Sequence, residues 1–155
     1  NLLKQRKIEC KFIIAGKGPL LKKILILGKS HPNIIYLGMV SEQQVNEILM
    51  TSNLTLAPYP KSKAFEKSIP NKIQMSWAYG IPILTTLKGT TSNFIKKYST
   101  GLSTISVDKA VDFIEDLKVN PTKMKTFSKN CKLLYKHQFN HIENYNMLVE
   151  RLIDL

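Results

Sequence analysis

Short apolar runs alternate with stretches of helical periodicity along most of this chain. The runs are four or five residues long, rich in Ile and Leu, and mostly ended by Gly or Pro, which is typical of buried strands. They lie at residues 11–15, 34–37, 54–57 and 81–84, and a weaker run follows at 102–105. The pattern therefore predicts five short strands.

Helical patterns follow each of these runs. Their expected starts are marked by Pro or by a capping Ser or Thr, and some of their expected ends by Gly. We expect helices from Pro19 to Gly28, from Ser41 (burying Val45, Ile48 and Leu49), from Pro70 to Gly80, from 91–92, from Ser106, from Pro121, and a last one with Ile142, Tyr145, Val149 and Leu152 on one face. Ser41 and Gln44 have the spacing of a capping box. Residues 58–69 are expected to form a loop, and Gln138–His141 a bend.

Strands joined by single helices predict an α/β fold, with a Rossmann-like parallel sheet that carries helices on both faces. We expect residues 1–155 to form a single domain. Ligands of such sheets bind at the carboxyl ends of the strands. Here those ends are residues 16–19, 38–41, 58–69 and 85–92.

Composition narrows the class of protein. The chain has 155 residues, 23 Lys+Arg against 11 Asp+Glu, and two cysteines. Two cysteines are too few for a disulfide scaffold, and we expect Cys10 and Cys131 to be buried thiols. No apolar run reaches the ~18 residues of a membrane span, and the N-terminus does not resemble a signal peptide. These features predict a soluble, cytoplasmic protein.

The net charge of +12 is unevenly distributed. Residues 1–30 carry eight basic residues and one acid, residues 31–60 carry no Lys or Arg, and residues 61–97 carry seven lysines and one acid. Two basic blocks could bind an anion such as a nucleotide, a nucleic acid or an acidic lipid. A solvated lysine-rich surface explains the same pattern.

Two segments are candidates for binding phosphate. Gly16, Lys17, Gly18 and Pro19 lie between a predicted strand and a helix, where glycine lets a ligand approach the backbone. Turn geometry alone would explain these glycines equally well. Residues 68–72 (SIPNK) lie at another predicted helix N-terminus, where free N–H groups and Lys72 would suit a diphosphate, although an ordinary Pro-started helix is the alternative.

Other catalytic or metal chemistry finds little support. His137 and His141 are four residues apart, but Gln138 stands between them and no third ligand is evident, so we predict no metal site. No Ser/His/Asp set or nucleophile elbow occurs.

Four segments together resemble one family. They read IIAGKGPL, NIIYLGMVS, LTLAPYP and SIPNKIQMSWAYGIPILTT, and the resemblance extends from Cys10 to Leu152. In this order and spacing they resemble the C-terminal, donor-binding domain of GT-B fold glycosyltransferases of the retaining family 4, also called group 1. The resemblance implies a hexosyltransferase-type enzyme whose substrate is a UDP- or GDP-linked sugar, with no other cofactor and no metal.

The resemblance also implies roles for individual residues. The donor would be bound by Gly16, Lys17, Gly18, Gly38, Met39, Val40, Ser68, Pro70, Asn71, Met75 and Thr91, and Lys72 would act catalytically. Lys72 and the helix N-terminus beside it would stabilise the charge that develops on the departing diphosphate.

Several positions depart from the family pattern. Met75 stands where the family has a glutamate that binds the ribose, Lys67 where it has another glutamate, and Asn93 where a glutamate is often found. In the family, a strand, an Arg/Lys loop and a whole acceptor domain come before the part that this sequence matches, and the resemblance places the start of this sequence after them, within the following helix. The resemblance thus implies a fragment, inactive alone, whose donor site is altered at the ribose.

The broader expectations follow from this resemblance. The acceptor would be a cell-surface polysaccharide or a glycolipid, reached through the missing domain. Contact with an anionic membrane at its inner face is a further expectation, and direct nucleic-acid recognition is not expected. The alternatives are a non-catalytic nucleotide-binding module of the same fold, a sugar-nucleotide epimerase, or a basic module that binds membranes or nucleic acids.

Overall fold

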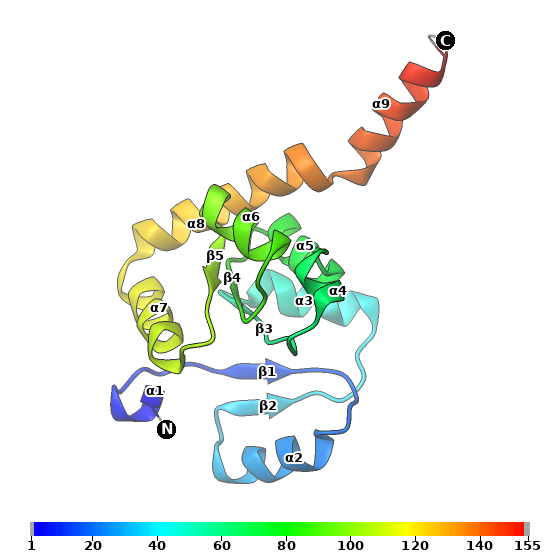
Figure 1. The fold of residues 1–155 in the computed structure, drawn as a ribbon. Helices are drawn as coiled ribbons and strands as arrows, with labels where there is room; N and C mark the ends of the chain where they lie inside the picture. Colours follow the sequence, from blue (N-terminus) through cyan, green and yellow to red (C-terminus); the bar gives the residue numbers. More distant parts are fainter. Residues whose placement is uncertain (1, 154–155) are drawn as a thin grey trace. The chain divides into compact units, whose positions relative to one another are not determined.

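The computed structural model describes residues 2–153, and for residues 141–143 it describes the backbone alone. Two compact units make up the chain, residues 1–51 and 52–155 (Figure 1). Each unit is a parallel sheet flanked by helices, so the predicted α/β, Rossmann-like class is confirmed. Among the described residues the strands form two separately hydrogen-bonded sheets, one in each unit.

Unit 1 is built on two strands. Its elements are α1 (Leu2–Gln5), β1 (Phe12–Ile14), α2 (Leu21–Ser30), β2 (Ile34–Tyr36) and α3 (Glu42–Thr51). β1 and β2 pair in parallel, with Ile13 opposite Ile35, and α2 packs against β2. The predicted capping box opens α3: the Ser41 N–H donates to Gln44 Oε1 at 2.8 Å, and the Gln44 N–H donates to Ser41 Oγ at 3.3 Å.

Unit 2 contains three strands in the order β3-β4-β5, all parallel. Its elements are β3 (Thr55–Ala57), α4 (Lys63–Glu66), α5 (Asn71–Ala78), β4 (Ile83–Thr85), α6 (Thr90–Tyr98), β5 (Gly101–Ser103), α7 (Val107–Val119), α8 (Pro121–Leu134), the π-helical turn η1 (Tyr135–Phe139) and α9 (His141–Ile153). Ser106 caps α7 as predicted, accepting from the Lys109 N–H at 3.3 Å.

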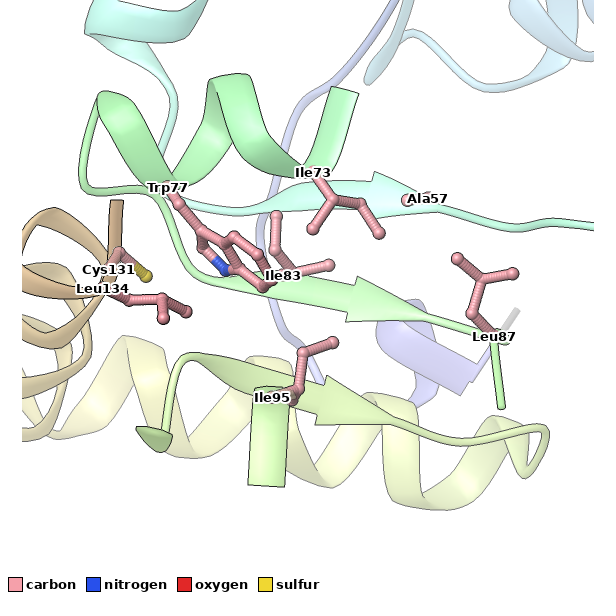
Figure 2. Packing of buried hydrophobic residues seen from close by; sticks show 8 residues of the cluster. All are labelled: Ala57, Ile73, Trp77, Ile83, Leu87, Ile95, Cys131 and Leu134. Carbon is pink, nitrogen blue, oxygen red and sulfur yellow. The ribbon is translucent and has the colours of Figure 1, made fainter. Parts of the chain in front are cut away.

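The core of unit 2 lies on both faces of β4. Successive side chains of a strand point to opposite faces, and Ile83 and Leu84 accordingly belong to different apolar clusters. On the Ile83 face, the buried side chains of Trp77, Ile95 and Leu134 come from α5, α6 and α8 (Figure 2). On the Leu84 face, α7 contributes Phe113 and Leu117 to the cluster, and α8 contributes Met124 and Phe127. Helices therefore cover both faces of this sheet.

Three local features differ from the expected pattern. Gly28 does not end α2, which continues to Ser30; a Cβ at Gly28 would lie 3.7 Å from Ile34 O, an ordinary van der Waals contact, so packing on β2 does not require glycine here. The expected loop contains α4, because Ser62 caps it by accepting from the Ala64 N–H at 3.3 Å.

The third difference is the bend expected at Gln138–His141. The chain instead forms η1 before it turns at Asn140. This turn brings Phe139 against Trp77, with ring centroids 5.3 Å apart, and against Phe94 at 5.7 Å. The chain therefore stays helical up to Phe139, in a wider π-helical turn, and the ring of Phe139 packs on the core of unit 2.

Smaller differences concern burial. Cys131 is buried as expected, but Cys10 is only half-buried. Val45, Ile48 and Leu49 are half-buried rather than buried. Ile142, which the pattern places on the apolar face of α9, lies outside the described side chains.

Trp77 is the largest fully buried side chain of the core. Trp77→Ala is expected to lower the free energy of unfolding by about 3–5 kcal/mol, because it removes a large apolar group and leaves a cavity. Val119→Ala, at the exposed last position of α7, is the control and should change it by less than about 1 kcal/mol. Denaturant unfolding measures both, and equal losses would contradict this assignment of the core.

The two thiols should differ in reactivity. Burial raises the pKa of Cys131 to about 12, so its reactive thiolate is suppressed in the folded protein. Between about pH 8.5, the ordinary thiol pKa, and about 12, iodoacetamide should alkylate Cys10 in the native chain and Cys131 only after unfolding. Peptide mass spectrometry distinguishes the two, and rapid native labelling of Cys131 would contradict the prediction.

Candidate functional site

In unit 1 the structure brings the two predicted nucleotide segments together. The turn at Gly16 follows β1 and the segment beginning at Gly38 follows β2, so both lie at the carboxyl ends of paired strands. The Gly16 N–H donates to Gly38 O at 2.6 Å, and the Tyr36 hydroxyl donates to Gly16 O at 2.8 Å. Lys17, Gly18 and Met39 are exposed beside this link, and Val40 is half-buried.

Positive φ angles explain both glycines in this link. Gly16 has φ +108° and Gly38 has φ +72°, conformations that side chains with a Cβ rarely adopt. No atom lies within 4 Å of a Cβ built at either position. The backbone turn therefore requires glycine at positions 16 and 38, and both positions also leave the backbone open to a ligand. Of the two glycines in the first motif, turn geometry explains Gly16 and not Gly18, whose φ is not positive.

In unit 2 the N-terminus of α5 carries the other predicted segment. Pro70 is the cap residue, in an extended conformation, rather than the first helical residue. The first helical bonds are donated to Pro70 O, at 2.9 Å by the Ile73 N–H and at 3.4 Å by the Gln74 N–H. For the N–H groups of Asn71 and Lys72, no acceptor is found within residues 2–153, and both residues are exposed.

The segment before α5 is held by hydrogen bonds from its neighbours. The buried Thr91 hydroxyl of α6 donates to Ser68 O at 2.9 Å, and the Gln74 side chain donates to Ile69 O at 2.9 Å. Gly89 packs so closely on Glu66 that a Cβ there would lie 2.1 Å from Glu66 O. These contacts fix the approach of the chain to the helix N-terminus.

Hydroxyl groups connect the carboxyl ends of the three strands in unit 2. Thr85 Oγ1 donates to Ala57 O at 2.6 Å, and Ser103 Oγ donates to Leu87 O. Thr86 Oγ1 accepts from the Tyr59 N–H at 2.8 Å and lies 2.9 Å from Tyr59 O, to which it donates. The sequence pattern placed residues 58–69 and 85–92 at this edge of the sheet but did not single out Thr85, Thr86 or Ser103. Thr85 and Thr86 directly follow a buried apolar run, which is a usable signal.

The electrostatics around α5 favour an anion. Between Glu47 and Asp108 the chain carries a single acid, Glu66. Over residues 61–88 the lysines are 61, 63, 67, 72 and 88, and all five are exposed. The partial positive charge of a helix N-terminus adds to these cations. The α5 N-terminus therefore combines free N–H donors with a positive surrounding charge.

The remaining predicted positions of unit 2 lie on or near α5. Met75 is exposed one turn after Lys72, and Lys67 is exposed before Ser68. Asn93 is exposed on α6. Neither Met75 nor Lys67 can supply a carboxylate, so Glu66 is the acid that lies nearest to this segment in the sequence.

No metal centre is found in the described part of the chain. Leaving aside the side chains of residues 141–143, no group of three His, Cys, Asp or Glu side chains is placed to hold an ion. His137 is exposed on η1, and the side chain of His141 lies outside the described residues.

The hydrogen bond from Thr91 to Ser68 O should hold the segment before α5 in place. Thr91→Val removes the hydroxyl that donates to Ser68 O, and it should lower the free energy of unfolding by about 1 kcal/mol. Amide hydrogen exchange over residues 66–70 should become faster. Thr91→Ser retains the hydroxyl and is the matched control. Unchanged exchange in Thr91→Val would show that the hydrogen bond does not hold this segment.

Comparisons with known proteins agree with this architecture. The family model of glycosyl transferases group 1 matches residues 1–118. No match was found among curated proteins. The fold resembles that of Anabaena HepE in complex with UDP-glucose, with TM-score 0.72 and 13% identity over 94% of this chain and 41% of HepE.

Two further solved structures share the fold. TarM is similar with TM-score 0.73 and 15% identity, covering 96% of this chain and 30% of TarM. Sucrose-phosphate synthase from Thermosynechococcus elongatus is similar with TM-score 0.69 and 15% identity, covering 92% of this chain and 38% of that one. The chain thus spans less than half the length of each of these structures. The fold is that of the C-terminal domain of a GT-B glycosyltransferase.

Proposed function

The chain belongs to the group 1 glycosyltransferases, because their family model matches more than half of it, and from this premise we propose that it is the donor-binding domain of a retaining enzyme. The donor in this proposal is a nucleoside-diphosphate sugar. UDP is the first nucleotide to test, since HepE, which shares the fold, has been solved with UDP-glucose, and GDP is the second.

The N-terminus of α5 is the observation that carries the proposal. It offers the free N–H groups of Asn71 and Lys72, the Lys72 ammonium, and a neighbourhood with one acid among many lysines. Donors of this kind bind phosphate oxygens strongly. In the proposal Ser68, Pro70 and Asn71 frame the diphosphate, and Thr91 keeps Ser68 in place.

Lys72 has the catalytic role in this proposal. When the glycosidic bond breaks, negative charge grows on the diphosphate leaving group. A cation and fixed N–H dipoles that bind the leaving group more strongly than the intact donor lower the barrier. No nucleophilic side chain is needed for this step.

Unit 1, taken by itself, also carries segments that we propose to bind nucleotide. Gly16, Lys17 and Gly18 present a glycine turn, and Gly38, Met39 and Val40 present backbone next to an exposed apolar side chain. Such a surface suits the nucleoside part of the donor, where backbone groups and apolar contacts fix a base.

The acceptor and cellular site remain proposals of the same kind. We propose that the acceptor is a glycan or lipid of cell-surface polysaccharide or glycolipid synthesis, that the reaction transfers a hexose, and that the enzyme works in the cytoplasm without nucleic acid. A further proposal is that this chain alone does not transfer sugar.

Within residues 2–153, no helix has both the length and the apolar character needed to cross a membrane.

One observation favours a second candidate, a non-catalytic nucleotide-binding module. Met75 and Lys67 leave α5 and its approach without the carboxylates that the resemblance places there. A module of this kind would bind nucleotide without transfer. Activity of the full-length protein with a panel of nucleotide sugars distinguishes the two candidates.

Nucleotide binding tests the proposal directly. Lys72→Met should weaken UDP binding about tenfold, because one charge-assisted phosphate contact contributes about 1.5 kcal/mol. Lys125→Met, on the exposed surface of α8, is the matched control and should bind as the parent chain does. Titration calorimetry gives the Kd values.

The outcomes are distinct. Binding of UDP or GDP that is equally weakened by both substitutions would assign the effect to net charge and remove Lys72 from the site. Absence of binding by the full-length protein would contradict the donor-domain proposal.

A further inference from the structure

The outer face of α2 combines exposed apolar side chains with lysines and does not belong to the proposed donor site. Leu21, Ile24 and Gly28 lie on the half-buried side of the helix, which packs on β2. The opposite side carries Lys22, Leu25, Ile26 and Lys29, at the i, i+3, i+4, i+7 spacing of one helix face. We call these four residues the α2 outer face.

The apolar exposure here is large for so short a helix. Ile26 is 67% exposed, Leu25 47% and Leu27 46%, and Leu20 just before the helix is 59% exposed. Single exposed apolar residues are ordinary, whereas a group of them on one element marks an interaction surface.

The charge around this face has one sign. Residues 10–41 contain five lysines and no Asp or Glu. Lys22 and Lys29 flank Leu25 and Ile26 on the same face. This combination of Leu and Ile with flanking lysines fits a surface that is apolar inside and negatively charged outside.

We propose that the α2 outer face docks on an anionic lipid bilayer. A basic amphipathic helix lies in the plane of the headgroups, with its apolar side chains inserted and its lysine stems reaching up to the phosphates. Each lysine near such a surface contributes to the attraction, as does each inserted apolar group. The α2 outer face supplies two lysines and two apolar side chains.

The composition of the face distinguishes a bilayer from a protein partner. Protein interfaces are enriched in aromatic residues, Met and Arg and depleted in Lys. The α2 outer face has only Leu, Ile and Lys. A second copy of the chain is disfavoured as well, since pairing two such faces would bring lysines together.

Vesicle binding of the 155-residue chain tests the proposal. The probes are vesicles of phosphatidylcholine with phosphatidylserine and vesicles of phosphatidylcholine alone. The parent chain should bind the anionic vesicles, and added salt should weaken that binding because it screens the charges. Lys22→Gln with Lys29→Gln should weaken it about 25-fold, at roughly fivefold per lysine.

The contribution of the apolar side chains to vesicle binding is tested separately. Leu25→Ser with Ile26→Ser should weaken binding at least about tenfold, because apolar surface is no longer inserted. Circular dichroism and thermal unfolding should show that both double variants remain folded, since the substituted side chains point to solvent.

Two matched controls keep the proposal falsifiable. Lys125→Gln with Lys129→Gln on α8 removes the same charge, and Leu148→Ser with Leu152→Ser on α9 removes exposed apolar groups. Both should change binding by less than about twofold. Equal losses in the controls, or failure of the parent chain to bind anionic vesicles, would overturn the proposal; in the latter case an acidic protein becomes the partner to seek.

Discussion

The burial of β4 on both faces is the constraint on which unit 2 depends. A central parallel strand has no solvent-facing side, so each of its residues needs a covering helix. Ile83 is covered from α5, α6 and α8, and Leu84 from α7 and α8. Because α5 and α6 are held against the Ile83 face, their N-terminal ends are held at the carboxyl edge of the sheet. The rigid core thus determines where the free N–H groups of α5 point.

Close backbone approach limits how this sheet can vary. Gly101 pairs with Ile83, and a Cβ at Gly101 would lie 2.0 Å from Ile83 O. Any side chain there would separate β5 from β4 and loosen the helices on both faces. The same reasoning applies to Gly89 beside Glu66. Packing at these two points connects the fold of unit 2 to the shape of the segment before α5.

Sequence patterns predicted the strands to within two residues, because short β-branched and Leu-rich runs ended by Gly or Pro leave few alternatives. The capping roles of Ser41 and Ser106 were also predictable, since they depend on neighbours within four residues. Other features depend on distant contacts. One is η1, which places the ring of Phe139 against those of Trp77 and Phe94, from α5 and α6. The hydrogen bond from Thr91 to Ser68 likewise joins residues that only the tertiary fold brings together.

The π-helical turn η1 has a consequence for everything beyond it. A π turn is equivalent to one residue inserted into an α-helix, and each α-helical residue turns the chain by about 100°. Deleting one exposed residue of η1, such as Lys136, would therefore rotate Phe139 and Asn140 by about this angle about the η1 axis and change the direction in which α9 leaves the turn at Asn140. Tyr145 and Leu152 would then face a different direction, although no residue of α9 had changed. A one-residue length change here would redirect the C-terminal helix and would also shift Phe139 relative to Trp77 and Phe94.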